Sequence, residues 1–411
     1  MTNFKVKISP IKEMEIRCSR IQGAISLAQG VPDFDTPLCI KNKAIQAITE
    51  GKATCYSLSP GLVELREAIE YNLSKKGIFY DFENEIIVTA GSIEAITASL
   101  LALCSEGDEV LISDPAYTSY QEAILLAREK PVFFPLKADD NWRFDFDELK
   151  KRITNRTRAL ILCNPNNPTG VIFSRTDLMK LVELAEYHDF YILSDEVYRD
   201  FVYDGKELFS LGQLSAFRKR LVFIFSFSKA YAMTGWRVGY LATDESLAKK
   251  IIASHDAMVT CAPVASQWGA LAALEMAQND INYFRDSYEK RRDTICSLFE
   301  TLKDWFSFVR PDSAYYFFPK ITKNFEKTFV EKRMKIIKSQ PYYAELRADQ
   351  QQSISWLLAL DLLDTQKLAL VPGIAFGSQG EKHLRLCFGR RESDIEQGVI
   401  RIKRYIENFL G

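Results

Sequence analysis

The stretch Arg220-Leu-Val-Phe-Ile-Phe225, continued by Ser226-Phe-Ser-Lys229-Ala-Tyr-Ala-Met, decides how the rest of this chain is interpreted. Its first six residues are mostly apolar, β-branched or aromatic, which predicts a buried strand that ends shortly before Lys229. In open parallel α/β sheets, ligands bind beyond the carboxyl ends of the strands. Apolar residues follow Lys229, so we expect desolvation to disfavour its ammonium form and leave an amine able to form a Schiff base.

Polar groups suited to a phosphate flank this lysine. Ser226 and Ser228 precede it and Arg237 follows it, so two hydroxyls and a guanidinium are available to one anion. The whole segment, SFSKAYAMTGWRVGYLA at 226–242, resembles the cofactor-lysine motif of the class I and II pyridoxal-phosphate aminotransferases, which have fold type I. That resemblance implies that Lys229 holds pyridoxal 5'-phosphate and that Arg237 binds its phosphate.

Composition favours a small-molecule enzyme. The chain has 411 residues, of which 47% are hydrophobic and 26% charged, and its 53 basic and 54 acidic residues give a net charge of -1. Such a balance provides no field for nucleic acid or lipid, and no apolar run approaches the roughly 20 residues of a membrane span. The amino terminus lacks the apolar core of a signal peptide. We therefore expect a cytoplasmic location.

The cysteines and histidines argue against other chemistries. Eight cysteines are scattered without a Cys-x-x-Cys pair, several of them in apolar runs, which predicts buried free thiols. The three histidines are equally dispersed, so a metal cluster or a Ser-His-Asp triad is disfavoured. Lysine remains the best candidate base.

The order of predicted elements indicates an α/β protein. Strand and helix patterns alternate from about Glu85 to about Leu241, which predicts a mostly parallel central sheet with flanking helices. Beyond roughly Asp304 shorter strands predict a smaller α/β domain. We expect a large cofactor-binding domain over 46–284 and a small domain formed by 1–45 and 285–411.

Two motifs lie where the cofactor's phosphate and ring are expected. Residues 85–103 predict a strand, a glycine turn and a helix, and the helix start at Gly91, Ser92 and Ile93 is suited to an anion. A plain serine N-cap is the alternative. Tyr117 follows the next strand, where the resemblance implies an aromatic residue that stacks on the pyridine ring.

Two further motifs follow predicted strands. Asn164-Pro-Asn-Asn167-Pro-Thr-Gly170 is either a simple turn or the family's N-P-x-N-P-T-G loop, in which Asn167 binds the cofactor's phenolic oxygen and the substrate carboxylate, and the Asn167–Pro168 bond tends to be cis. Asp195-Glu-Val-Tyr198 ends a buried strand. By the resemblance Asp195 keeps the ring nitrogen protonated and Tyr198 donates to the phenolic oxygen; the alternative is an N-cap and a core tyrosine.

The resemblance also implies the substrate contacts and a partner subunit. Gly30, in Leu27-Ala-Gln-Gly30-Val-Pro, lets the backbone approach the substrate carboxylate, and Arg385 binds that carboxylate with both ends of its guanidinium. Tyr56 reaches the phosphate of the neighbouring subunit's cofactor. The family resemblance is the only reason to expect a homodimer.

The sequence departs from the family in one long segment. A lysine-rich insert near 322–352 predicts either a solvated helical excursion or a lid or partner-facing arm beside the substrate entrance. Ser313 also stands where relatives often have glycine.

The predicted function is transfer of the amino group of an L-amino acid to a 2-oxo acid by a ping-pong mechanism. A C–S lyase or an enzyme like aminocyclopropane-carboxylate synthase shares these motifs and remains an alternative. A non-catalytic cofactor-binding regulator is a more remote one. The sequence does not identify the side chain of the substrate.

Overall fold

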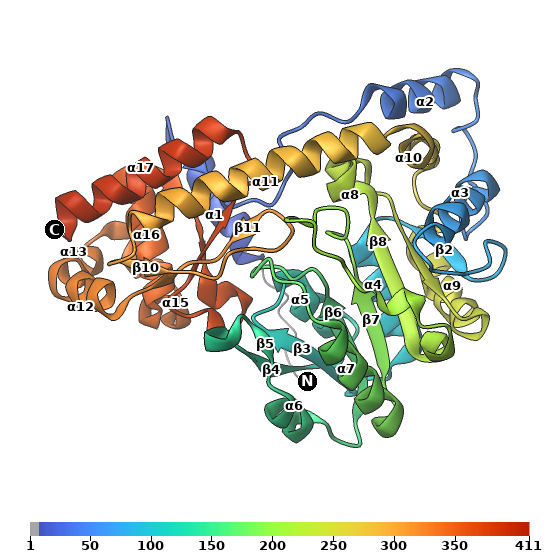
Figure 1. The fold of residues 1–411 in the computed structure, drawn as a ribbon, viewed down its shortest axis with the longest axis horizontal. Coiled ribbons are helices and arrows are strands. Elements are labelled where there is room, and N and C mark those ends of the chain that lie inside the picture. Colours follow the sequence, from blue (N-terminus) through green and yellow to red (C-terminus); the bar gives the residue numbers. More distant parts are fainter. Residues whose placement is uncertain (1–7, 411) are drawn as a thin grey trace.

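The computed structural model describes residues 8–410 and is built around an eight-stranded sheet in the order β2–β9–β8–β7–β6–β3–β4–β5 (Figure 1). The five strands from β8 to β4 in that order pair in parallel, whereas β9 and β5 run antiparallel to their neighbours. The strands are β2 (Ile86–Thr89), β3 (Glu109–Asp114), β4 (Lys130–Lys137), β5 (Arg143–Phe144), β6 (Thr157–Cys163), β7 (Tyr191–Asp195), β8 (Leu221–Ser226) and β9 (Gly239–Thr243). The predicted α/β fold with a mostly parallel sheet is confirmed.

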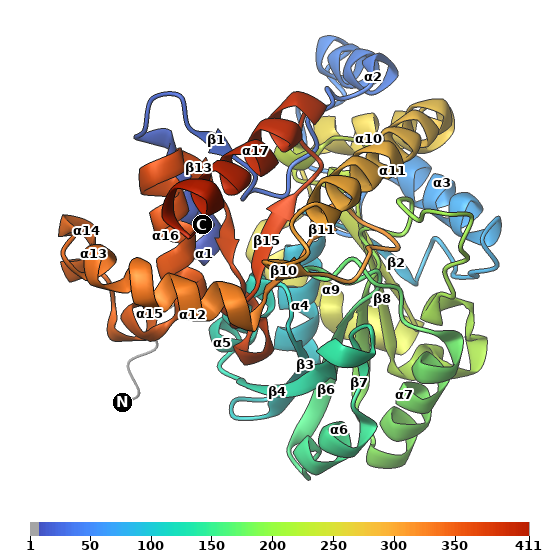
Figure 2. The same cartoon turned by 60° about the vertical axis from the view of Figure 1, so that its left-hand side comes forward.

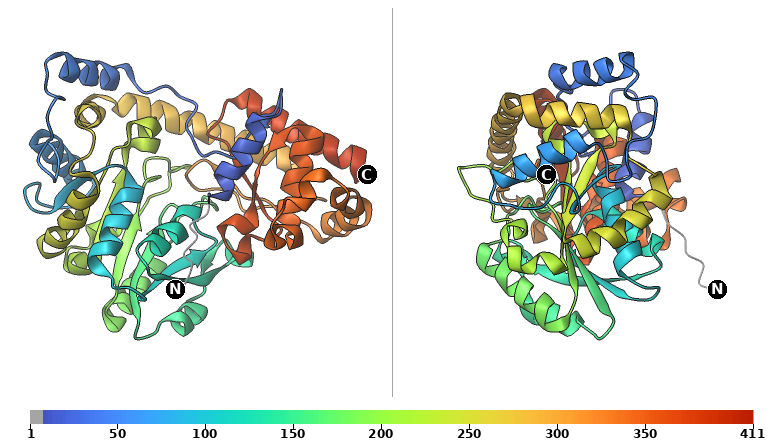
Figure 3. Two further views of the ribbon diagram at one scale, coloured as in Figure 1. Left: turned by 180° about the vertical axis from the view of Figure 1, so that it is seen from behind. Right: turned by 90° about the vertical axis from the view of Figure 1, so that its right-hand side faces the viewer.

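The strand before Lys229 is buried on both faces. Along β8, Val222 and Ile224 point into one hydrophobic core, while Phe223 and Phe225 point into another on the opposite face. A strand covered on both sides needs apolar residues at every position, which explains its unbroken apolar run. Helices lie on both faces of the sheet (Figures 1 and 3). They include α3 (Val63–Ser74), α4 (Ser92–Leu103), α5 (Thr118–Leu126), α6 (Phe146–Arg152), α7 (Arg175–His188), α8 (Phe227–Ala230), α9 (Glu245–Val259) and α10 (Val264–Met276).

The carboxyl-terminal part forms a second layer of structure beside this sheet (Figure 2). Its strands are β10 (Phe306–Ser307), β11 (Tyr316–Phe317), β12 (Lys320–Ile321), β13 (Leu368–Ala369), β14 (Val371–Pro372) and β15 (Leu384–Cys387), and its helices include α16 (Ile354–Gln366) and α17 (Glu392–Phe409). The amino-terminal β1 (Ile25–Ser26) pairs in parallel with β13, next to α1 (Pro10–Ser19). The amino-terminal arm therefore completes the carboxyl-terminal part.

Both predicted domain boundaries fall inside helices. The boundary at 45/46 lies in α2 (Leu38–Thr49), which packs against α10, and the boundary at 284/285 lies in α11 (Gln278–Glu300). The division into two domains therefore stays a prediction. Short 3₁₀ helices occupy Ala138–Asp140, Leu211–Gln213, Ser215–Arg220, Thr234–Trp236, Gly373–Phe376 and Ser378–Gly380.

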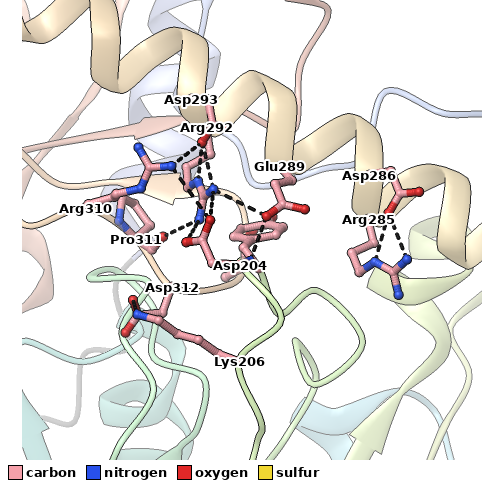
Figure 4. A network of polar contacts seen from close by, with 12 residues as sticks. Asp204, Lys206, Arg285, Asp286, Glu289, Arg292, Asp293, Arg310, Pro311 and Asp312 are labelled. Carbon is pink, nitrogen blue, oxygen red and sulfur yellow. Dashed lines mark hydrogen bonds and ion pairs between the residues drawn. The ribbon is translucent and has the colours of Figure 1, made fainter.

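A buried arginine in α11 joins this long helix to two loops (Figure 4). Arg292 is fully buried, and its two terminal nitrogens donate to the carboxylate of Asp204 at 2.6 and 2.8 Å. This pairing holds the pKa of Asp204 below its usual value. The adjacent Tyr203 donates its backbone N–H to the carbonyl of Asp312 at 3.0 Å. The loop after β7 is thereby held against the segment that leads into β11.

The lysine-rich insert is helical, as predicted, but its inner face is not solvated. It consists of α12 (Lys323–Lys332), α13 (Met334–Lys338), α14 (Pro341–Ala344) and α15 (Ala348–Gln352). Phe325 and Phe329 are buried, and Arg333 forms a buried pair with Asp361 of α16 at 2.8 and 2.9 Å. The insert is thus part of the packed structure. Its role as a lid or arm stays a prediction.

All eight cysteines are free, but they are not all buried. Cys55 is exposed because the loop that carries it lies on the surface, so the prediction of a buried thiol is wrong at that position. Among the helices of residues 8–410, none is long and apolar enough to cross a membrane.

Candidate active site

The sheet topology brings the candidate residues to one edge. The parallel strands β3, β6, β7 and β8 end there, and β9 begins there, since Gly239 pairs with the last residues of β8 and β2, Ser226 and Thr89. A cavity of about 230 Å³ lies at this edge. The predicted residues that line it are Gly30, Ser92, Ile93, Tyr117, Asn167, Asp195, Tyr198, Ser226, Ser228, Lys229, Arg237 and Arg385.

Lys229 follows β8 and extends into the cavity. Its Nζ donates a hydrogen bond to the carbonyl of Gly30 at 2.8 Å. Burial lowers the pKa of Lys229 to about 8, and the charges of Arg385 and Arg237 act in the same direction. A substantial fraction of this amine is therefore neutral near physiological pH, as a nucleophile or base requires.

Asp195, the last residue of β7, is a buried carboxylate. It is 3% exposed and accepts hydrogen bonds from Tyr120 Oη at 2.7 Å and from the backbone N–H of Val197 at 3.2 Å. Burial raises the pKa of Asp195 to about 6 despite these bonds. Within residues 8–410 no cation lies at ion-pair distance from it. A cationic group in the cavity would stabilise its charged form.

The start of α4 lies beside Arg237 at the cavity. Gly91 is the N-cap of α4 and no side chain caps the first amides, so the alternative in which Ser92 serves as the N-cap is wrong. A Cβ at Gly91, which has φ +91°, would lie 2.5 Å from Nη2 of Arg237. Glycine thus lets the guanidinium approach the helix terminus. With the hydroxyls of Ser226 and Ser228 on the same cavity, these donors fit a phosphate.

Arg385 is a buried cation without a buried anion. It is 1% exposed and lies between the rings of Tyr316 and Phe376, at 4.4 and 4.8 Å from their centroids. Its nitrogens donate to Asn167 Oδ1 at 3.1 Å and to the carbonyl of Ala28 at 2.5 Å, while Nε has no partner. No carboxylate of the described chain pairs with it. This arrangement fits a carboxylate ligand.

Asn167 joins this arginine to Tyr198. Its Nδ2 donates to Tyr198 Oη at 3.4 Å, and the Asn167–Pro168 bond is cis, as the resemblance implied. Tyr198 Oη also lies 2.8 Å from Tyr316 Oη. The alternative in which Tyr198 is only a core tyrosine does not explain its place on the cavity wall.

Ten residues on the cavity wall were not predicted from the sequence, among them Tyr120, Tyr316 and Lys12, whose side chains carry polar groups. Tyr120 lies one turn after Tyr117 on α5, a spacing that places both on one face and that a helical pattern would reveal. Tyr316 and Lys12 come from distant segments, and no local signal points to them. Conversely, Tyr56 is 81% exposed and does not line this cavity within the described chain.

The sequence profile described as "Aminotransferase class I and II" matches residues 22–402. The chain belongs to this aminotransferase family. The aromatic-amino-acid aminotransferase 2 of Thermococcus litoralis is 34% identical over 98% of the chain and 96% of its own length, and the aspartate aminotransferase of Pyrococcus abyssi gives the same figures. The aspartate aminotransferase structure from Thermus thermophilus with maleate is 29% identical, covers 97% of both chains and superposes with a TM-score of 0.82.

These similarities confirm the fold type I architecture and the predicted activity. The protein is an aminotransferase that moves amino groups between amino acids and 2-oxo acids. The relatives named here are aminotransferases rather than C–S lyases or cyclopropane synthases.

Proposed function

We propose that this aminotransferase uses pyridoxal 5'-phosphate bound at the cavity described above. The observation that carries the proposal is the meeting, in one cavity, of a lysine amine with a lowered pKa, a buried carboxylate without a cation and a buried arginine without an anion. In this proposal the start of α4, with Gly91, Ser92 and Ile93, binds the phosphate together with Arg237 and the two serines. Tyr117 stacks on the ring, and Asp195, Tyr198 and Asn167 bind its polar atoms.

In this proposal each residue of the site has a separate role in amino-group transfer. When bound, pyridoxal phosphate would supply an electron-withdrawing ring that makes the Cα proton of the substrate more acidic. Neutral Lys229 Nζ would accept the Cα proton and, as the ammonium, would return a proton from the same face. Arg385 and Asn167 hold the substrate carboxylate, with Gly30 allowing its close approach. Because the carboxylate is held, the Cα–H bond is the one aligned for cleavage, which favours proton transfer over loss of the carboxyl group.

A two-step assay tests this proposal. Purified protein with added pyridoxal phosphate should release a 2-oxo acid from an amino acid alone, at most one equivalent per site, and should turn over only when a second 2-oxo acid is supplied. Initial rates should give the parallel double-reciprocal lines of a ping-pong mechanism. Continuous release of ammonia without an acceptor would indicate the lyase alternative. Failure of all twenty amino acids to react would indicate the regulator alternative.

We also propose that amino acids with acidic side chains are the preferred donors. Four basic side chains line the cavity, and the roles proposed for Lys229, Arg237 and Arg385 leave Lys12 unassigned. Lys12 lies in the first turn of α1 and has no acidic partner among residues 8–410. A cation on the cavity wall that binds neither the phosphate nor the α-carboxylate would be available to a distal carboxylate. The relatives are named for both aspartate and aromatic amino acids.

Replacing Lys12 with methionine is expected to lower kcat/KM for aspartate and glutamate by about tenfold, the effect of losing one charged hydrogen bond. Values for alanine should not change, because alanine has no distal carboxylate. Steady-state kinetics with the three donors measure this effect, and the surface variant Lys249→Met is the matched control. An equal loss with all three donors would contradict a role in side-chain recognition.

The proposed assembly is a homodimer. Large apolar side chains are exposed on α2 and on the loop after it, each at least 60% accessible: Leu38, Ile45, Ile48, Tyr56 and Leu58. Exposed apolar side chains concentrated in one region are typical of protein interfaces. In a dimer formed through this region, Tyr56 would reach the phosphate of the partner's cofactor.

The double variant Ile45→Asp/Ile48→Asp is expected to shift the protein from dimer to monomer and to reduce activity at least tenfold at micromolar concentration, since buried unpaired charges cost several kcal/mol. Light scattering and activity measured over a dilution series test this. Tyr187→Asp, which alters another exposed tyrosine on α7, is the control. A dimeric double variant would contradict this interface.

A cytoplasmic location is also proposed. Eight free cysteines fit a reducing compartment, where thiols persist without pairing. The near-zero net charge favours small-molecule partners over nucleic acid.

A further inference from the structure

Two tyrosine hydroxyls meet inside the cavity. Tyr198 Oη and Tyr316 Oη are 2.8 Å apart, both side chains are at most 4% exposed, and their rings are nearly perpendicular. Tyr316 comes from β11 in the carboxyl-terminal part, whereas Tyr198 follows β7 of the central sheet. Distances alone do not say which hydroxyl donates to the other. The surrounding groups decide it.

The orientation of the Asn167 amide restricts the hydrogen bonds that Tyr198 can form. Arg385 carries only donors, so the atom of Asn167 that it contacts must be the carbonyl oxygen, and Nδ2 must face Tyr198 Oη. Tyr198 therefore accepts one hydrogen bond from Asn167. A phenol accepts up to two bonds and donates one, which leaves one acceptor position and one proton.

Two arrangements remain. If Tyr198 donates to Tyr316, its only proton is used and it has none for a ligand, while the buried proton of Tyr316 lacks an acceptor among the described residues. If Tyr316 donates to Tyr198, the proton of Tyr316 is satisfied and that of Tyr198 is directed at the cavity. Because buried donors are rarely left unpaired, the second arrangement is favoured when the cavity holds an acceptor.

The protein holds Tyr316 in place for this contact. A Cβ at Gly30 would lie 2.1 Å from Tyr316 Oη, so only glycine lets the hydroxyl reach its position. On the other side, Ala314 donates its N–H to the carbonyl of Phe201 at 3.0 Å, which ties the segment before Tyr316 to the segment after Tyr198. The Arg292 network of Figure 4 fixes that junction from α11.

We propose that Tyr316 is a positioning residue that donates its hydroxyl proton to Tyr198 and thereby directs the proton of Tyr198 at the cofactor's phenolic oxygen. The inference rests on the proposed binding of pyridoxal phosphate. A donor at the phenolic oxygen stabilises the negative charge of that oxygen. The cofactor's proton next to this oxygen, whose loss sets the pH midpoint of the visible absorption, therefore dissociates at lower pH. A hydroxyl that accepts a hydrogen bond is a stronger donor, so the bond from Tyr316 strengthens the bond that Tyr198 donates.

The variant Tyr316→Phe tests the direction of donation. Protein saturated with pyridoxal phosphate is titrated, and the pH midpoint of the bound cofactor's visible absorption is recorded. The midpoint should rise by about one unit when the supporting hydrogen bond is lost. A fall would mean that Tyr198 donates to Tyr316 and is released by the substitution. A fall or an unchanged midpoint overturns the proposal.

Two comparisons make the result specific. Tyr288→Phe removes another buried hydroxyl that has no hydrogen-bond partner, so its midpoint should equal that of the wild type. In a Tyr198→Phe background, adding Tyr316→Phe should cause no further shift, whereas additive shifts would show that Tyr316 acts independently and would contradict the proposal. If the wild type acquires no visible band, the cofactor proposal itself fails. A normal band with an unmoved midpoint in Tyr316→Phe refutes only the role of Tyr316.

Discussion

Replacing Lys229 with alanine is expected to lower the rate of amino-group transfer by at least about 10⁴-fold, the upper range for loss of a general base. Nζ of Lys229 lies in the cavity, donates to the carbonyl of Gly30 at 2.8 Å and has a pKa lowered to about 8. No other amine among the residues described has both a place on the cavity wall at a strand end and a lowered pKa. The variant should still bind pyridoxal phosphate through the phosphate site, with weaker retention.

Formation of 2-oxo acid from a single addition of amino acid measures the loss. Treatment with borohydride followed by mass spectrometry provides a second readout, since the wild type should carry the cofactor irreversibly attached at position 229 and the variant should not. The surface variant Lys249→Ala controls for removal of a lysine. Transfer at more than about a hundredth of the wild-type rate, or attachment in Lys229→Ala, would contradict the assignment.

The central sheet and the residues at its edge were predictable because the signals are local. The strand β8 reads as a continuous apolar run, since both its faces are buried, and Lys229 follows at the position where parallel sheets bind ligands. Asp195 ends the strand β7 and Asn167 follows the strand β6. Once the strands are parallel, their ends must share one edge, so the sequence order of these residues implies their proximity.

The contacts between the two parts of the chain were not predictable from local pattern. Tyr198 and Tyr316 are 118 positions apart, and β11 has only two residues, too few for an alternating pattern. The lysine-rich insert near 322–352 also makes a contact that its local sequence does not predict. Its lysines indicate a solvated surface, whereas Arg333 pairs with Asp361 in the interior, a contact that no spacing rule connects. The role proposed for Tyr56 requires a partner chain, so the fold of one chain cannot decide it.

Replacing Asp195 with asparagine is expected to have opposite effects in the cofactor-free and cofactor-bound protein. Without cofactor, burial raises the pKa of Asp195 from 3.8 to about 6. The folded state therefore binds this proton more tightly than the unfolded chain does, and stability is lost as the pH rises through that interval. The loss amounts to about 3 kcal/mol at neutral pH, at 1.36 kcal/mol per pKa unit.

Asparagine has no charge to bury, so the cofactor-free variant should be more stable than the wild type above pH 6, with a gain of up to about 3 kcal/mol that disappears near pH 4. In the cofactor-bound protein the same substitution should instead be harmful to the reaction. The carboxylate would no longer pair with the protonated ring nitrogen, and transfer should slow by about 10² to 10³-fold, the cost typical of removing one group that stabilises charge in a reaction.

Urea unfolding of the cofactor-free proteins at several pH values, together with rates for the bound forms, tests both effects. Asp361→Asn is the matched control, because Asp361 is equally buried but already paired with Arg333. Its replacement should destabilise the protein by about 3 to 5 kcal/mol with or without cofactor, since it leaves a buried arginine unpaired. If Asp195→Asn destabilised the cofactor-free protein as Asp361→Asn does, Asp195 would already have its counter-charge within the chain. Stabilisation without cofactor and loss of rate with it would show that the counter-charge of Asp195 is supplied by the cofactor.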